Sequence, residues 1–187
     1  MPVKRIPAPT AEALIRPVWL RAVITVVFAV VTIFWQDETL TLLKVSVAAY
    51  FVLGATAVWD YAKDEEVVPA VVRGPLALGA AVWVLSGLAT VFVGTTTAAA
   101  VIAGVGFVAM GVAELVSGIR GRREFVPSRD QVLLGAVGTL TGVSLLVGMQ
   151  LDVHGILGIA GMGVIIMAVL LMISGAGLVH EARRERD

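Results

Sequence analysis

The sequence predicts an all-α membrane protein in which six transmembrane helices form three tandem helical hairpins. Three observations support this fold class: a very apolar composition, six apolar segments of membrane-spanning length, and an internal repeat. Of the 187 residues, 58% are apolar and only 15% are charged, and the mean hydropathy is +0.95. Soluble domains usually carry about 25% charged residues, so a water-soluble globule is not expected.

The six apolar segments each approach or exceed the length that a spanning helix needs, roughly 20 residues. Each is apolar on all sides, as expected for a helix in lipid. Helices satisfy their own backbone hydrogen bonds in lipid, and the alternating pattern of a transmembrane barrel is missing. We read the first segment as a retained helix, since it is long, ends in Trp35 and lacks an Ala-x-Ala exit. The predicted spans are Val18–Trp35, Leu40–Trp59, Pro75–Val93, Thr97–Ile119, Gln131–Met149 and Val153–Val179.

An arginine opens each predicted hairpin. Arg73 follows Arg16 by about 57 residues and Arg129 follows Arg73 by about 56, a fixed period that indicates a repeated supersecondary unit. The stretch Leu78-Gly79-Ala80 after Arg73 recurs as Leu134-Gly135-Ala136 after Arg129. We therefore expect one integral membrane domain over residues 1–187, with repeats at about 16–60, 73–119 and 129–181 and short tails.

Residues at the predicted helix starts fit this frame. Pro17 and Pro75 are expected in a first helical turn, where a missing N–H costs little. Ser128, after Pro127, is expected to cap the fifth helix, and Thr95–Thr97 the fourth. Trp83 lies too deep for an interfacial belt and is expected to pack inside the protein.

The connections alternate in charge, which predicts the topology. Residues 36–39, 94–96 and 150–152 hold no Lys or Arg, whereas the other connections and both tails hold Lys or Arg, and only Lys44 falls towards the opposite side. The 60–72 connection is locally acidic, but acidic residues count little in the positive-inside rule. By the positive-inside rule, both termini lie in the cytoplasm of a multi-pass plasma (inner) membrane protein. The basic residues that set this orientation are Lys4, Arg5, Arg16, Arg21, Lys63, Arg73, Arg120, Arg122, Arg123, Arg129, Arg183, Arg184 and Arg186.

Six charged residues are expected at similar depth near the cytoplasmic helix ends, where they could form an ionic girdle. Ionisable groups within a membrane are paired or functional by default. Glu114 stands out because it lies a turn or more inside its apolar segment. One interpretation is structural, with arginines that pair or extend to headgroups; the other gives Glu114 a transport or proton-sensing role. The six residues are Arg21, Asp60, Arg73, Glu114, Arg129 and Glu181.

Glycines recur in the third to sixth helices and are candidates for helix packing. Small residues let helix backbones approach closely, and Gly138 and Gly142 form a GxxxG motif. The contact could lie between helices of one chain or between two copies. The candidate residues are Gly79, Gly87, Gly111, Gly138, Gly142, Gly158 and Gly161.

No catalytic, cofactor-binding or metal-binding set is predicted. Cysteine is absent, and no Ser-His-Asp set, HExxH or P-loop occurs. His154 and His180 are expected on opposite faces of the membrane, so they cannot share a site. The net charge of zero gives no indication of nucleic-acid binding. The expected partners are the lipid bilayer and either other membrane proteins or a second copy of the chain.

The sequence combines the tandem hairpins and the opening arginines with two further pieces, Phe51-Val52-Leu53-Gly54 and Val108-Ala109-Met110-Gly111. This combination resembles the HdeD-like acid-resistance membrane proteins, which are built from a short repeat of unknown function. The first repeat departs from the pattern, with Arg21 and Ala22 where the others have Leu and Gly. The resemblance implies a non-enzymatic role in acid or envelope stress tolerance, and we expect a scaffold or interaction partner. The alternative is a small proton-linked transporter or channel that uses Glu114.

Overall fold

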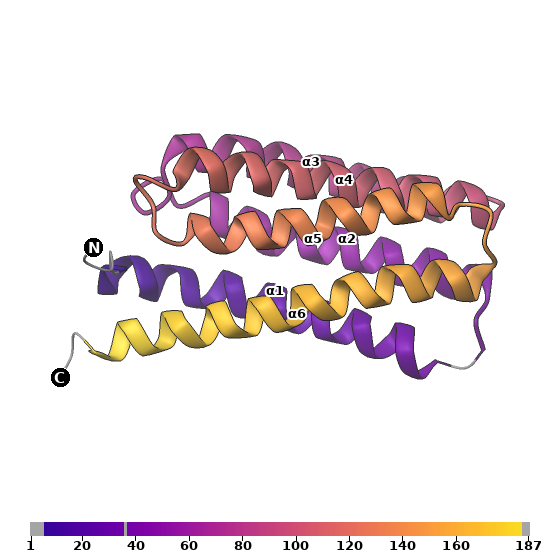
Figure 1. Cartoon of the computed structure of the whole chain (residues 1–187), viewed down its shortest axis with the longest axis horizontal. Helices are drawn as coiled ribbons and strands as arrows, with labels where there is room; N and C mark the ends of the chain where they lie inside the picture. The colour runs from indigo at the N-terminus through magenta and orange to yellow at the C-terminus, as the bar shows by residue number, and fades with distance from the viewer. Residues whose placement is uncertain (1–5, 36, 185–187) are drawn as a thin grey trace.

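The computed structural model describes residues 6–35 and 37–184, which form six helices and no strand (Figure 1). All six helices are long and apolar enough to cross a membrane, which confirms the predicted fold class. The predictions for Lys4, Arg5, Gln36 and Arg186 fall outside the described residues. The helices are α1 (Ala8–Phe34), α2 (Leu40–Ala62), α3 (Ala70–Phe92), α4 (Thr96–Gly121), α5 (Ser128–Val147) and α6 (Val153–Arg184).

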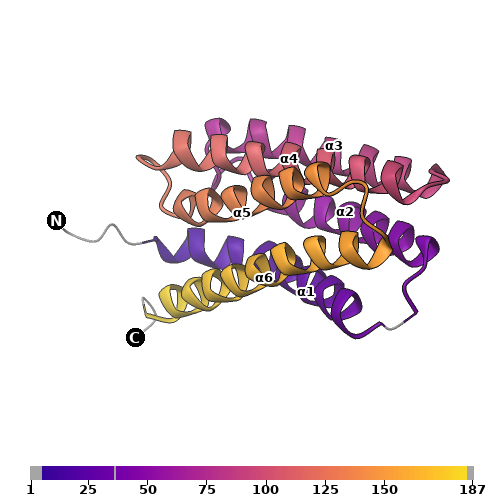
Figure 2. The same ribbon diagram turned by 45° about the vertical axis from the view of Figure 1, so that its right-hand side comes forward.

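The helices run up and down in three hairpins (Figure 1). Each helix packs against the next one in the chain, and α6 packs along α1, so the bundle closes on itself (Figure 2). The α1–α2, α3–α4 and α5–α6 connections lie at one end, here called the turn end. Both termini and the two remaining connections lie at the opposite end, here called the terminal end.

Two helices begin earlier than the sequence predicted, so two prolines lie inside helices instead of in first turns. The first helix starts at Ala8, with Pro17 inside it. The third starts at Ala70, with Pro75 inside it. An internal proline removes one backbone hydrogen bond. The added turns bury apolar side chains that offset this loss, including Ala11, Leu14 and Val72, which are at most 1% exposed.

The predicted helix caps have different outcomes. Thr95 caps α4 as expected, since its hydroxyl accepts a hydrogen bond of 3.2 Å from the Ala98 amide. The prediction for Ser128 is wrong: Pro127 is the N-cap of α5 and Ser128 is its first helical residue, with no side-chain cap hydrogen bond. Ser128 is instead fully buried against Gly121, because α4 and α5 approach closely there.

Apolar side chains cover the outside of the bundle as well as its inside. On α1, for example, Val23, Val27, Val30 and Ile33 are about half exposed and form one outward stripe. Such a surface suits lipid, in which apolar side chains need no cover. Trp83 is 1% exposed, which confirms its predicted place in the interior.

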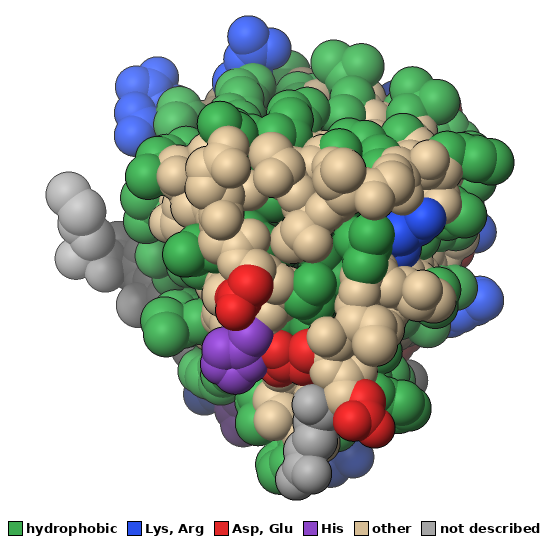
Figure 3. Space-filling view, turned by 90° about the vertical axis from the view of Figure 1, so that its right-hand side faces the viewer, with side chains coloured by type: hydrophobic (Ala, Val, Ile, Leu, Met, Phe, Trp, Pro, Cys, Tyr) green, Lys and Arg blue, Asp and Glu red, His purple; other side chains and the backbone are tan. Residues whose placement is uncertain are grey.

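The turn end carries the acidic groups seen in Figure 3, where red carboxylates gather beside a histidine within a rim of apolar side chains. Here the Nδ1 atom of His154 lies 2.7 Å from the Oε2 atom of Glu38. This contact joins the first connection to the start of α6 and therefore links the first hairpin to the third.

Candidate functional site

A buried ion pair joins α1 to α4 in the interior of the bundle. The Nη1 atom of Arg21 donates a hydrogen bond to the Oε1 atom of Glu114, and the two residues are 93 positions apart in the chain. The Arg21 side chain is 10% exposed and that of Glu114 is 1% exposed. The pair therefore connects the first hairpin to the second through a contact that is buried inside the bundle.

Besides Glu114, Trp83 of α3 contacts the Arg21 guanidinium group. The Arg21 Cζ atom lies 5.5 Å from the centroid of the Trp83 ring, within range of a cation–π interaction. The indole Nε1 donates a hydrogen bond of 2.9 Å to the Gly106 carbonyl, which fixes the ring. Arg21 is thus held by one charge and one aromatic face.

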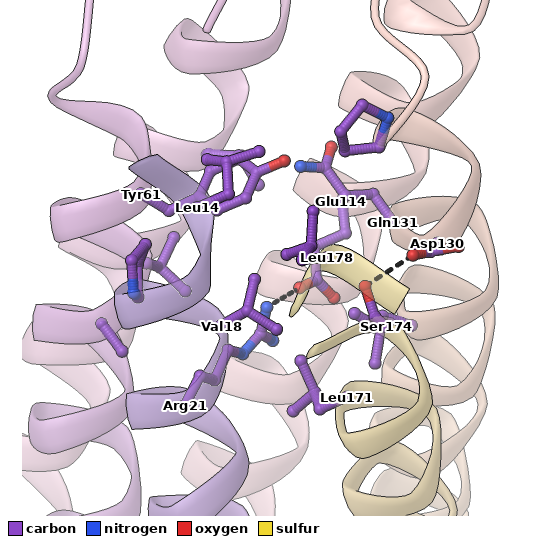
Figure 4. A pocket seen from close by; sticks show the side chains of 16 residues that line it. Leu14, Val18, Arg21, Tyr61, Glu114, Asp130, Gln131, Leu171, Ser174 and Leu178 are labelled. Atoms are coloured by element: carbon purple, nitrogen blue, oxygen red, sulfur yellow. Dashed lines mark hydrogen bonds and ion pairs between the residues drawn. The ribbon is translucent and has the colours of Figure 1, made fainter. Parts of the chain in front are cut away.

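A central cavity begins at this ion pair and extends toward the terminal end (Figure 4). The space open to the centre of a water molecule is about 40 Å³. One water needs roughly 10–15 Å³ by this measure, so a few molecules fit. All six helices contribute to the lining, which includes Val18, Tyr61, Leu76, Leu134 and Leu178 besides the ion pair.

Polar groups line the cavity from the ion pair to the mouth of the cavity. The Oε1 atom of Gln131 and the Nε atom of Arg21 are buried and have no hydrogen-bond partner in the described chain. The Tyr61 hydroxyl points toward the Gln131 side chain (Figure 4). Nearer the surface, the Ser174 hydroxyl donates a hydrogen bond of 2.6 Å to Asp130. The cavity is therefore polar along one wall and apolar elsewhere.

A cluster of five aromatic side chains closes the interior on the turn-end side of the ion pair. Phe51 and Trp83 stack with centroids 5.3 Å apart, and Phe107 meets Phe51 edge-on at 5.1 Å. Tyr50 lies 4.7 Å from Phe28 and 5.7 Å from Phe107. Every member is at most 4% exposed. We call Phe28, Tyr50, Phe51, Trp83 and Phe107 the aromatic plug.

The other four members of the predicted girdle do not join the buried pair. Asp60 contacts Lys63 at 2.6 Å and Arg16 at 3.8 Å. Arg73 pairs with Glu65 of the α2–α3 connection at 2.6 Å. Arg129 and Glu181 form no ion pair with any residue that the structure describes. Among the described residues, four of the six therefore take part in ion pairs, one pair buried and the others local, and the six do not form one ring.

Glycines bring α4 and α5 into backbone contact. A methyl group placed on Gly135 would lie 2.6 Å from the Gly111 carbonyl oxygen, and one on Gly142 would lie 2.6 Å from that of Gly104. One on Gly118 would lie 2.7 Å from the Ser128 carbonyl oxygen. These distances leave no room for a side chain, so the two helices touch at seven-residue intervals.

The remaining candidate glycines differ in their surroundings. A methyl group on Gly138 would lie 3.3 Å from the Gly111 Cα atom, so this position is tight but less crowded. A methyl group on Gly79 would lie 2.8 Å from the Ala113 Cβ atom, and one on Gly87 would lie 3.1 Å from the Ala48 carbonyl oxygen. A methyl group on Gly161 would lie 2.6 Å from the Thr32 hydroxyl oxygen, on the contact between α6 and α1.

Gly158 differs from the other candidate glycines because a methyl group there would meet nothing within 4 Å. Within the described chain it therefore lines no close helix contact. Conversely, Gly118 and Gly135 lie in the α4–α5 contact and are missing from the sequence-based candidates. Their seven-residue spacing from Gly111 and Gly142 is the signal that would have identified them.

One model of a known protein family matches part of this chain. Residues 77–147 match a family model, the short repeat of unknown function (DUF308). The matched segment runs from α3 through α4 to the end of α5, so it contains Glu114, Trp83 and the α4–α5 glycine contact. No curated protein and no solved structure matches the chain.

Proposed function

We propose that this protein is a non-enzymatic, multi-pass protein of the plasma (inner) membrane of the HdeD-like type. Its role is to support tolerance of acid and envelope stress as a scaffold or interaction partner for other membrane proteins. The DUF308 repeat supports the family assignment, because this repeat is found in HdeD-like membrane proteins.

The observation that carries this proposal is the closed interior. The central cavity stops at the aromatic plug, and its 40 Å³ hold a few waters and no metabolite of ordinary size. The outer surface, in contrast, is broad and apolar. A protein with little internal space and a large lipid-facing surface is suited to act through contacts within the membrane.

The proposed orientation places the terminal end in the cytoplasm. Arg120, Arg122 and Arg123 lie at that end, whereas the three connections at the turn end hold no Lys or Arg. This distribution agrees with the positive-inside rule.

A survival and co-purification experiment tests the stress role. A strain that lacks the gene is challenged in acid and complemented with the wild type or with Gly111→Leu, which disrupts the α4–α5 contact. We expect the wild type to restore survival and Gly111→Leu to restore less. In mild detergent, the wild type should co-purify with a membrane protein in fixed stoichiometry. Unchanged survival without the gene, or strict isolation of one species, contradicts the proposal.

A second candidate function is a small proton-linked transporter or channel. The observation that favours it is the position of Glu114 at the inner end of a polar cavity. The test is proton flux in liposomes under a pH gradient, with Glu114→Gln as the matched variant. Robust flux that Glu114→Gln abolishes would replace the scaffold proposal, and flux equal to that of empty liposomes would exclude this candidate.

A further inference from the structure

We infer that the central cavity is a water-filled vestibule through which Glu114 exchanges a proton with the terminal side of the membrane alone. This inference concerns the site of the second candidate function and adds the side of access, the route and the barrier. It requires no net transport, so a protein that acts only as a scaffold could still contain such a vestibule.

The first support is the pair of buried polar atoms without partners. Among the described residues, Arg21 Nε has no acceptor and Gln131 Oε1 has no donor, although Arg21 and Gln131 are only 8% and 6% exposed. Both residues line the cavity. A buried polar group without a partner is strongly unfavourable, and ordered water is the usual remedy where space allows. The cavity provides that space directly beside them.

The second support is the position of the mouth. Asp130 is exposed and Ser174 is half-buried, and their hydrogen bond bridges α5 and α6 at the edge of the cavity. Asp130 lies in the first turn of α5, which begins at the terminal end. Water can therefore enter between α5 and α6 from that side, pass Gln131 and reach Glu114.

The third support is the barrier on the opposite side. In α1 to α4, the residues of the aromatic plug lie closer to the turn end than the residues of the same helix that line the cavity. On α4, for example, Phe107 precedes Glu114 by two turns, and α4 begins at the turn end. Beyond the plug, Val47, Ala103 and Ile156 are at most 1% exposed and fill the interior. Apolar packing of this kind excludes water.

The charges that face Glu114 favour the approach of a cation. Arg21 faces it from α1, Tyr50 and Tyr61 from α2, and Asp130 lines the same cavity from α5. The lining residues from α3 and α6 carry no titratable group; they are Leu76, Leu171, Ser174 and Leu178. With both carboxylates ionised and Arg21 protonated, the site has a net charge of −1.

The proposed step is a proton transfer with no other bond change. A hydronium ion in the vestibule gives its proton to the Glu114 carboxylate and becomes water. The ion pair with Arg21 then loses its negative partner while Arg21 keeps its charge. Return of the proton to water restores the pair. The first hairpin is thereby coupled to the proton concentration on one side of the membrane.

Cysteine accessibility tests the route, and the natural chain helps because it contains no cysteine. Three single variants are made in sealed vesicles of both orientations: Ser174→Cys at the mouth, Leu134→Cys inside the cavity, and Ser86→Cys beyond the plug as the matched control. Ag⁺ is the probe for all three because it is small. A cationic and an anionic methanethiosulfonate are compared at Ser174→Cys.

We expect Ag⁺ to modify Ser174→Cys and Leu134→Cys from the terminal side at least tenfold faster than from the turn side, and to leave Ser86→Cys unmodified from both sides. The cationic reagent should react faster than the anionic one, and the added change Asp130→Asn should reduce this preference. An unreactive Leu134→Cys, or equal rates from both sides, overturns the vestibule. Each variant is accepted only if it elutes in detergent as the wild type does; if Leu134→Cys fails this criterion, Gln131→Cys takes its place.

Infrared spectroscopy of the same vesicles tests the proton itself. The Glu114 band is the protonated-carboxyl absorption of the wild type that is missing from Glu114→Gln. We expect this band to grow when the terminal side is acidified and to stay constant when only the turn side is acidified. A band that responds to the turn side contradicts the inference. Normal labelling without flux would exclude only the transport function, whereas failed labelling excludes the vestibule, so the two failures can be distinguished.

Discussion

Removing one partner of the Arg21–Glu114 pair should destabilise the protein far more than removing both. Arg21→Leu leaves Glu114, which is 1% exposed, without its cation. Glu114→Leu leaves the Arg21 guanidinium beside the Trp83 ring at 5.5 Å but without the Glu114 carboxylate. The double variant Arg21→Leu/Glu114→Leu leaves no buried charged residue in the part of the chain that the structure describes.

The burial of the pair sets the expected magnitudes. Breaking a buried ion pair by removing one partner typically costs about 3–5 kcal/mol, while replacing both partners with apolar side chains is often neutral or stabilising. We therefore expect each single variant to lower the free energy of unfolding by about 3–4 kcal/mol. The double variant should lie within about 1 kcal/mol of the wild type, which gives a coupling energy of several kcal/mol.

Reversible unfolding in mixed detergent micelles is a suitable assay, with helix content followed by circular dichroism. Arg16→Leu is the control, since Arg16 is 82% exposed and lies 3.8 Å from Asp60; exposed pairs contribute about 0–1 kcal/mol. If the single and double variants lose the same stability, or if the coupling energy is below about 1 kcal/mol, the pair does not lock the two hairpins together and the reasoning fails.

Three further predictions follow from the packing and the topology. Gly111→Leu should destabilise the bundle by about 1–3 kcal/mol in the unfolding assay, because even its Cβ would lie 2.8 Å from the Gly135 carbonyl oxygen. Gly158→Leu is the matched control with open space around it and should change stability by at most about 0.5 kcal/mol. Equal losses in the two variants would contradict the α4–α5 contact. Trp83→Phe should lose about 1–2 kcal/mol, since it removes the hydrogen bond to the Gly106 carbonyl and weakens the contact with Arg21; no loss would mean that the indole N–H is dispensable. Glu66→Cys and His154→Cys should react with an impermeant thiol reagent from opposite sides of the membrane, Glu66→Cys from the cytoplasmic side, and labelling from one side only would refute the proposed topology.

The helices themselves could be predicted because lipid imposes a simple rule on sequence. A spanning helix needs a long apolar segment, and this requirement is visible without any tertiary information. The starts of α1 and α3 were less predictable. The segments that precede Pro17 in α1 and Pro75 in α3 contain polar residues, and they are helical because Leu14 and Val72 are buried by neighbouring helices. A tertiary contact overrides the local signal there.

The buried pair could be predicted only in part. The sequence singled out Glu114 by its depth and Arg21 as a member of the girdle, but it could not distinguish Arg21 from Arg73 or Arg129 as the partner. That choice depends on the rotation of α1, which turns Arg21 inward toward Trp83, while Arg129 is exposed. Gln131 and Tyr61 were missed for the same reason, since neither carries a motif and both matter only through the cavity they share.

The contact between α6 and α1 means that the bundle has no obligatory first helix. Gly161 meets Thr32 and Gly175 meets Trp19 along this contact, much as glycines connect α4 with α5, so the junction between the ends of the chain resembles the junctions within it. Both termini lie at the same end of the bundle (Figure 1). A circular permutant that joins the termini through a polar linker and opens the chain between α2 and α3 would keep every helix contact and the orientation of every span. The order of the hairpins along the chain is therefore separable from the architecture that they build.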